Sequence, residues 1–193
     1  MLARLQATGV SCLGIETDDE IGGNWMKRYD SVTLHTSKSM NELPFDRMFN
    51  ANSYFLTGKD YAQGLKNFAH QHHLQVWLSS SVQKTTYDSQ NGHWTVQVLK
   101  KGVQQTVRAK HLVMALGGGV DKPNIPDISN RDEFKGSAMH SSQWKNANGL
   151  QSKHGVVFGT GSSAFDVAED MVRGGCANVT VIQRGQCRKL YRR

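Results

Sequence analysis

The sequence of 193 residues lacks the long apolar run that a membrane-spanning helix requires. No stretch approaches the roughly 18–20 apolar residues that cross a bilayer, and residues 1–5 are too short and too mixed in character for a signal peptide. The three cysteines, Cys12, Cys176 and Cys187, form no C-x-x-C pair, as expected in a reducing compartment. These absences predict a cytoplasmic protein with no membrane partner.

Metal-ligand sets and nucleophilic catalytic motifs are also missing. His70, His72 and His73 lie close together in the sequence, but no cysteine or acid completes a tetrahedral set at the usual spacing. None of the serines lies on a G-x-S-x-G turn between a strand and a helix. We therefore expect no metal site and assign no catalytic residue from the sequence.

Positive charge is not spread along the chain. Of the net charge of +7, five units come from residues 184–193, which contain no acid, so that residues 1–183 carry +2. Only Tyr191 adds an aromatic ring to this basic end. A nucleic-acid-binding surface needs clustered cations together with stacking or groove-reading groups. The charge pattern thus predicts a solvated chain end and no nucleic-acid partner.

Periodicity and turn residues predict alternating helices and strands. Residues 2–8 are typical of a helix that Gly9 ends, and residues 10–15 form a strand that stops at Glu16. The next region is expected to be rich in loops as far as residue 58. An amphipathic helix follows over 59–72. Four strands of an antiparallel meander are expected at 74–78, 81–88, 94–100 and 104–109, and a buried strand at 111–115.

A strand, a glycine loop and a helix come in succession near the C-terminus. Residues 156–158 are expected to be a strand, 164–173 a helix and 179–183 the next strand, with Phe165, Ala168, Met171 and Val172 packing. The loop carries G-x-G-x-x-A at Gly159, Gly161 and Ala164, with Ser162 and Ser163 inside it. The first glycine permits a tight turn, the second a close approach of a pyrophosphate, and Ala164 close packing of helix on strand. The helix N-terminus attracts the phosphates.

Charge at two strand ends predicts which dinucleotides bind. Arg184 follows the second strand of the glycine-loop unit, where an arginine attracts the 2′-phosphate of NADPH. Glu16 occupies the matching place after strand 10–15, where an acid suits a ribose without a 2′-phosphate, such as that of FAD. The fold class is therefore predicted as α/β, with two incomplete Rossmann-like units and the antiparallel meander.

Two further stretches resemble flavin-containing and Baeyer–Villiger-type monooxygenases. Residues 134–144 match the fingerprint F-x-G-x-x-x-H-x-x-x-W at Phe134, Gly136, His140 and Trp144. The stretch from Glu16 to Leu34, with Gly22-Gly23-Asn24-Trp25 and Arg28-Tyr29-Asp30-Ser31, is similar to the flavin-proximal part of these enzymes, as is His35-Thr36. Ala115-Leu116-Gly117 and Pro123 to Pro126 take the place of the family's A-T-G and P-x-x-P stretches. The branch with the greatest similarity is that of the fungal-type soluble enzymes.

The resemblance implies an FAD held by residues 1–146, including the meander, and an NADPH held by residues 147–193. NADPH would reduce the flavin, which reacts with oxygen to a hydroperoxide that oxygenates a small organic substrate. The implied FAD-binding residues are Glu16, Gly22, Gly23, Trp25, Arg28, His35, Ala115 and Gly117. The implied NADPH-binding residues are Gly159, Gly161, Ser162, Ser163, Ala164 and Arg184, and the fingerprint would form a linker that responds to NADPH.

Several departures from the family pattern lead us to expect a chain truncated at both ends. The family's first G-x-G-x-x-G is not in the sequence, and Leu116 replaces a threonine. A fragment of this kind is expected to have reduced activity or none, and the alternative function is an NADP(H)-binding remnant or regulatory module without turnover. A flavin-dependent disulfide reductase is disfavoured because no redox-active cysteine pair follows Glu16. The substrate, the choice between heteroatom oxygenation and Baeyer–Villiger insertion, and the oligomeric state stay open.

Overall fold

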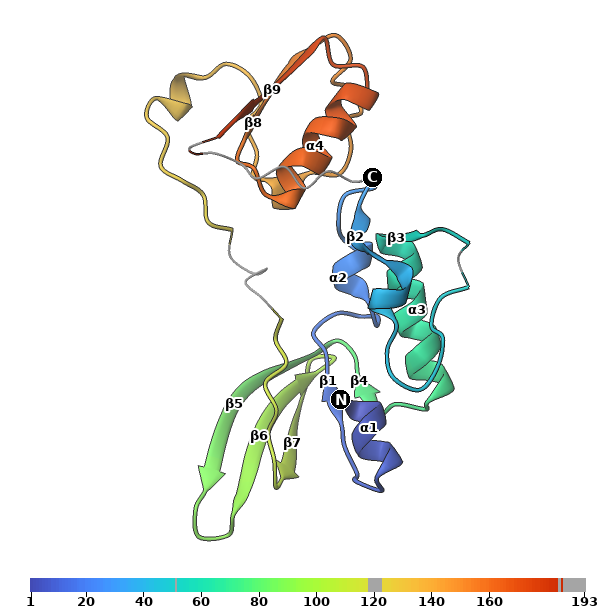
Figure 1. Cartoon of the computed structure of the whole chain (residues 1–193). Coiled ribbons are helices and arrows are strands. Elements are labelled where there is room, and N and C mark those ends of the chain that lie inside the picture. Colours follow the sequence, from blue (N-terminus) through green and yellow to red (C-terminus); the bar gives the residue numbers. More distant parts are fainter. Residues whose placement is uncertain (51, 118–122, 184, 186–193) are drawn as a thin grey trace. The chain divides into compact units, whose positions relative to one another are not determined.

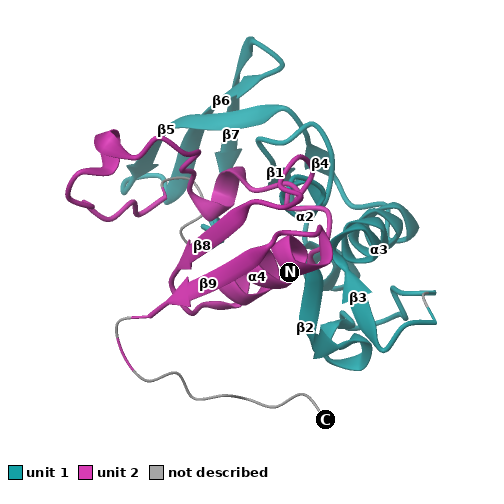
Figure 2. Ribbon diagram, turned by 90° about the horizontal axis from the view of Figure 1, so that it is seen from above, with its two compact units in different colours: residues 1–27, 33–117 teal, residues 28–32, 118–193 magenta. Residues whose placement is uncertain are grey.

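The computed structural model describes residues 1–50, 52–117, 123–183 and 185. Helices and strands are mixed along the chain (Figure 1), which confirms the predicted α/β class. The chain divides into two compact units: unit 1 consists of residues 1–27 and 33–117, and unit 2 of residues 28–32 and 118–193 (Figure 2). This division differs from the predicted boundary at residue 146, and the assignment of one domain to each dinucleotide stays a prediction.

Unit 1 begins with a short helix and a parallel strand pair. Helix α1 (Leu2–Ala7) leads through Gly9 to β1 (Gly14–Ile15). Strand β1 pairs in parallel with β4 (Val76–Trp77), with Gly14 opposite Val76. The strand predicted at 74–78 therefore does not belong to the antiparallel meander. Sequence proximity suggested the meander, but β4 follows a helix that returns the chain to β1 in the parallel direction.

That returning helix is α3 (Gly58–Gln71), within one residue of the prediction. It begins in a capping box: the Thr57 hydroxyl accepts from the Asp60 amide at 3.1 Å, and the Asp60 carboxylate accepts from the Thr57 amide at 3.1 Å. Two free amides of the first turn are thereby satisfied. The buried residues of α3 repeat at helical spacing, so one face of the helix packs on the core.

The segment predicted as loop, residues 17–58, contains short elements. These are α2 (Gly23–Met26), β2 (Thr33–Ser37), the 3₁₀ helix η1 (Lys38–Asn41) and β3 (Phe55–Thr57), and β2 and β3 pair antiparallel. Elements of three to five residues carry too few repeats to show a period. These short elements are held in place by the side chains that they bury in the core. Leu56 of β3 is wholly buried in a core whose other members are Ala3, Leu34, Met48, Phe49 and Phe68.

Three long strands form the antiparallel sheet of unit 1. Strands β5 (Ser80–Asp88), β6 (His93–Lys100) and β7 (Val103–Ala109) pair in the order β5-β6-β7 (Figure 1). Gly92 and Gly102 turn the chain between them with positive φ angles of 65° and 81°. On the central strand Val96 and Val98 are buried, because alternate residues of a strand face the same side.

The strand predicted at 111–115 is not formed. Residues 111–117 have no regular secondary structure, and Val113, Met114 and Leu116 are 52%, 64% and 82% exposed. An apolar run is typical of a buried strand only where a neighbouring strand supplies hydrogen-bond partners. Among the residues that the structure describes, no strand pairs with this segment.

Unit 2 is built on a strand, a helix and a strand. Strand β8 (His154–Phe158) pairs in parallel with β9 (Asn178–Ile182), and α4 (Ser162–Arg173) connects them. Two short 3₁₀ helices, η2 (Arg131–Glu133) and η3 (Ser141–Gln143), precede β8. The buried residues of α4 are Ala164, Val167 and Ala168. Phe165 and Val172, expected to pack, are 47% and 62% exposed, because the small residues of α4 face its neighbours instead.

The described residues contain neither a membrane-spanning helix nor a cluster of metal-ligating side chains. None of the helices there is long and apolar enough to cross a membrane. The same part of the chain contains no group of three or more histidine, cysteine or acidic side chains placed to hold a metal ion. The His72 ring instead lies 2.9 Å from the Asp46 carboxylate.

Candidate nucleotide-binding site

The glycine loop lies between β8 and α4, as the sequence predicts. Strand β8 ends at Phe158, and α4 begins at Ser162. The Gly159 amide donates to the Ile182 carbonyl at 2.9 Å, which holds the start of the loop against β9. Gly159 has φ of 119°, a conformation that side chains with a Cβ rarely adopt. The first glycine is therefore required by the backbone itself.

Space and backbone polarity at the loop suit an anionic ligand. A Cβ added to Gly159 or Gly161 would meet no described atom within 4 Å, so open space lies beside both residues. Gly161 is the N-cap of α4, and among the described residues no side chain caps this helix end. Amides of a first helical turn need acceptors, and the helix dipole favours negative charge there. The loop thus fits a phosphate group by geometry and by charge.

The first turn of α4 is fixed by packing. Ala164 is 8% exposed, and its amide donates to the Gly161 carbonyl at 2.9 Å. The small side chain lets the helix pack closely, which agrees with the reason for alanine at this position of the motif. Ser162 is exposed and Ser163 half-buried, so both predicted loop serines lie at the same helix end as the open space.

A segment far away in the sequence also contacts α4. Residues 28–32 belong to unit 2, although the residues on either side belong to unit 1. Tyr29 is 7% exposed, and its hydroxyl donates to the Asp166 carboxylate at 2.6 Å. Burial, then the hydrogen bond with Asp166, raise the pKa of Tyr29 to about 12 from its ordinary value of 10.

This raised pKa predicts a pH effect on stability. Because the folded state holds the Tyr29 proton more tightly than the unfolded chain, the hydroxyl contributes stability fully below pH 10 and loses it as the pH rises towards about 12. We expect the difference in unfolding free energy between the native chain and Tyr29→Phe to be constant from pH 7 to 9.5 and to shrink above pH 10. Urea unfolding at each pH measures it, and a difference that grows above pH 10 would contradict the assignment.

The fingerprint residues of unit 2 form three local arrangements. The Phe134 ring covers Gly136, where a Cβ would lie 2.4 Å from the ring. His140 caps η3, because its Nδ1 accepts from the Ser142 amide at 3.2 Å. Trp144 is 4% exposed, and its Nε1 donates to the Asp170 carboxylate of α4 at 2.9 Å. The fingerprint is thereby attached to the glycine-loop helix through its tryptophan.

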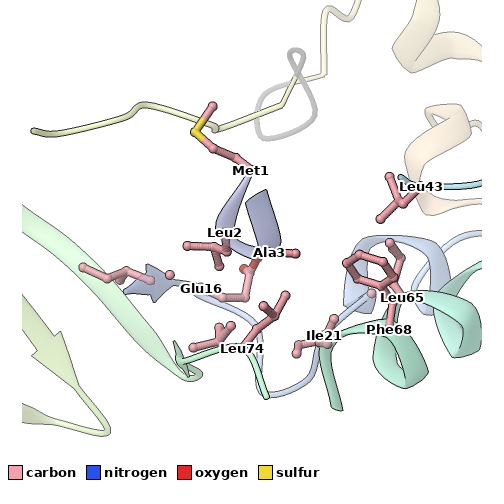
Figure 3. A pocket seen from close by; sticks show the side chains of 14 residues that line it. Met1, Leu2, Ala3, Glu16, Ile21, Leu43, Leu65, Phe68 and Leu74 are labelled. Carbon is pink, nitrogen blue, oxygen red and sulfur yellow. The ribbon is translucent and has the colours of Figure 1, made fainter. Parts of the chain in front are cut away.

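Two of the residues predicted to bind FAD line one cavity of unit 1. Glu16 and Gly22 are among the residues around a cavity of about 320 Å³ whose other walls are mostly apolar (Figure 3). One Glu16 oxygen, Oε1, accepts from the Asp18 amide at 3.0 Å and from the Thr17 hydroxyl at 3.2 Å. Gly22 has φ of 81°, and a Cβ there would lie 2.9 Å from the Ala62 Cα. A glycine is therefore needed at this position, because α3 approaches it closely.

The other predicted FAD residues are not gathered at this cavity. Gly23 is buried beside Asp18, and Trp25 packs edge-on against Tyr61, with ring centroids 5.0 Å apart. His35 lies exposed on β2, and Arg28 belongs to unit 2. Ala115 and Gly117 are exposed in the irregular segment. Arg184 lies outside the described residues.

Sequence reasoning overlooked three residues that contact α4 or belong to it: Tyr29, Asp166 and Asp170. The sequence places Tyr29 only in the flavin-proximal stretch, and it gives the two acids no role. Each contact joins residues at least 26 positions apart in the sequence. The sequence offered one signal: Asp166 and Asp170 are four residues apart in a predicted helix, which places both side chains on the same side of it.

A parallel strand, an open glycine loop and a helix define the dinucleotide-binding class of α/β proteins. Residues 17–191 match the pyridine nucleotide-disulphide oxidoreductase family, and the chain belongs to it. The sequence is 28% identical over 173 residues to the probable indole-3-pyruvate monooxygenase YUCCA10 of Arabidopsis thaliana, which covers 88% of this chain and 45% of that protein. It is 28% identical over 182 residues to the indole-3-pyruvate monooxygenase YUCCA1 of Oryza sativa subsp. japonica, with 94% and 44% covered.

Solved structures share the fold. The S-allyl-L-cysteine S-oxygenase from Allium sativum superposes with a TM-score of 0.84 at 18% identity, over 97% of this chain and 49% of that one. A steroid monooxygenase bound to NADP gives 0.75 at 22% identity, over 95% and 36%. The resemblance to flavin-dependent monooxygenases is thus confirmed. The chain spans just under half the length of the curated relatives it matches.

Proposed function

We propose that this chain is the NADPH-binding part, with a portion of the FAD-binding part, of a monooxygenase that acts on a small organic substrate. The observation that carries the proposal is the open glycine loop at the uncapped N-terminus of α4. The relatives support it, since the curated ones are named monooxygenases and a structural neighbour is described as a complex with FAD and NADP. The fungal-type branch and the cytoplasmic location belong to the same proposal.

NADPH is assigned to unit 2. The backbone of Gly159 and Gly161, with Ser162 and Ser163, would hold the pyrophosphate on the first-turn amides of α4, and Ala164 would keep the helix close to β8. Arg184 would pair with the 2′-phosphate, a role that follows from its place in the sequence just after β9. A neutral loop, a helix dipole and a cation would then bind the three phosphates without a metal.

FAD is assigned in part to unit 1. Glu16 follows β1 and reaches a cavity that it shares with Gly22, and a carboxylate there suits the hydroxyls of a ribose. No second G-x-G-x-x-G is present in the sequence, so the chain offers its glycine cradle to one dinucleotide. FAD supplies the redox chemistry with oxygen when it is bound. The residues of this chain would bind and orient the ribose.

A second candidate function has a specific observation in its favour. Ala115 and Gly117, expected beside the flavin, are exposed in a segment with no regular structure. A chain that binds NADP(H) at α4 without holding FAD would be a nucleotide-binding module with no turnover. The two functions differ in one property, the binding of flavin.

Titration of the purified chain with each cofactor tests both functions. We expect saturable binding of NADPH, measured by calorimetry, with NADH bound at least about tenfold more weakly because it lacks the 2′-phosphate. The variant Arg184→Gln should lose this preference while it binds NADH as the native chain does.

Flavin then separates the two candidates. Retention of FAD, seen in its visible absorbance, with NADPH oxidation that depends on FAD, would support the monooxygenase. NADPH binding without flavin would favour the module. Failure to bind NADPH at all would exclude both.

A further inference from the structure

A five-residue segment leaves unit 1, packs in unit 2 and returns. Residues 28–32 are part of unit 2, while Lys27 and Thr33 on either side are part of unit 1. The Asp30 amide donates to the Lys145 carbonyl at 2.8 Å, and the Asn146 side chain donates to the Asp30 carboxylate at 2.8 Å. Val32 is 8% exposed. The segment is thus held in unit 2 by backbone, side-chain and apolar contacts.

Tyr29 is the residue of this segment that reaches α4. Its hydroxyl donates to the Asp166 carboxylate at 2.6 Å. Asp166 is the fifth residue of α4, close to one turn from the start of the helix. A single buried hydroxyl of a distant segment therefore holds the beginning of α4.

The position of Asp166 matters for the glycine loop. Asp166 follows Gly161 by five residues, so the first turn of α4 lies between this contact and the loop, and open space lies beside Gly161. Among the described residues no side chain caps this helix end. Helix ends fray unless contacts hold them. The hydrogen bond of Tyr29 with Asp166 supplies such a contact from a distant part of the chain.

We propose that Tyr29 is a positioning residue for the dinucleotide: its hydroxyl, bonded to the Asp166 carboxylate, fixes the first turns of α4 so that the loop amides are aligned for phosphate. The inference rests on the proposed binding of NADP(H) at this loop. It adds Tyr29 to the site, a residue whose segment is flanked on both sides by residues of unit 1.

The variant Tyr29→Phe tests the proposal in the full chain. It keeps the buried ring and removes the hydroxyl. We expect the Kd for NADP⁺, measured by calorimetry at a temperature well below unfolding, to rise about tenfold, equivalent to about 1.4 kcal/mol. Asp166→Ala removes the other partner of the same hydrogen bond and should raise the Kd by a similar factor. The double variant should be little weaker than either single one, since both changes remove the Tyr29–Asp166 hydrogen bond.

The control variant Asn146→Ala loosens the same segment at Asp30 without touching α4. It should lower the melting temperature and leave the Kd within about twofold, because a change of global stability alone does not alter the affinity of the folded protein. Equal Kd values for the native chain, Tyr29→Phe and Asp166→Ala would overturn the inference while the proposed function stands. An equal rise in Asn146→Ala would reduce Tyr29 to a general structural role. A native chain that binds no NADP⁺ would remove the proposed function and the inference together.

Discussion

Gly161→Asp is expected to abolish nucleotide binding while the chain becomes no less stable. Gly161 has φ of −74° and ψ of 170°, which any residue adopts, and a Cβ there meets no described atom within 4 Å. An aspartate at this N-cap position would accept from the first-turn amides of α4 and contribute a few tenths of a kcal/mol relative to glycine. The same carboxylate would occupy the phosphate space with a like charge. We expect the Kd for NADPH to rise about a hundredfold or more, roughly 2.7 kcal/mol.

Gly161→Asn is the matched control, because asparagine has the size of aspartate and caps helices equally well without the charge. It should weaken NADPH by a smaller factor, about tenfold, from the loss of space alone. Calorimetry gives the Kd, and thermal unfolding followed by circular dichroism gives the stability. Unchanged NADPH affinity in Gly161→Asp would show that the phosphates do not bind at this loop. A large fall in the melting temperature of either variant would contradict the open geometry.

Trp144→Ala is expected to destabilise α4 more than any change at the surface of unit 2. The indole is 4% exposed, and its Nε1 donates to Asp170 on the helix. Truncation of a buried tryptophan typically costs about 3–5 kcal/mol, and Asp170 would also lose this donor. Protection of the α4 amides against hydrogen exchange should therefore fall by a factor of roughly 100 or more.

Two further variants separate packing from hydrogen bonding. Trp144→Phe keeps much of the apolar volume and should cost about 1–2 kcal/mol through the lost donor and the smaller ring. Trp94→Ala removes a tryptophan of β6 in unit 1, where it packs against Tyr87, and should leave the exchange of α4 unchanged. Protection of α4 that does not respond to Trp144→Ala would show that the fingerprint tryptophan does not hold this helix.

The glycine loop could be predicted from the sequence because its determinants are local. Gly159, Gly161 and Ala164 are each needed within six residues, and the helix that follows is long enough to show its period. The structure places β8, the loop and α4 in this order. The helix over 59–72 was predictable for the same reason, with a capping box added at its start.

Two strand predictions were wrong in whole or in part because strand pairing joins residues far apart in the sequence. An apolar run is compatible with a strand at 111–115, but whether a strand forms depends on a partner, and the described residues supply none. The strand at 74–78 exists as β4, yet its partner is β1, about sixty residues earlier. A sequence pattern indicates which residues prefer an extended backbone, but it does not indicate which strand they pair with.

By itself the sequence determined the glycine loop, its flanking elements and the resemblance to flavin-dependent monooxygenases, because each depends on residues close together in the chain. Only the tertiary structure decided that residues 28–32 pack in unit 2, with the Tyr29 hydroxyl on Asp166. A hydroxyl and a carboxylate 137 positions apart leave no periodic signal. Their hydrogen bond exists because both are brought into one buried place, where a polar group without a partner is costly.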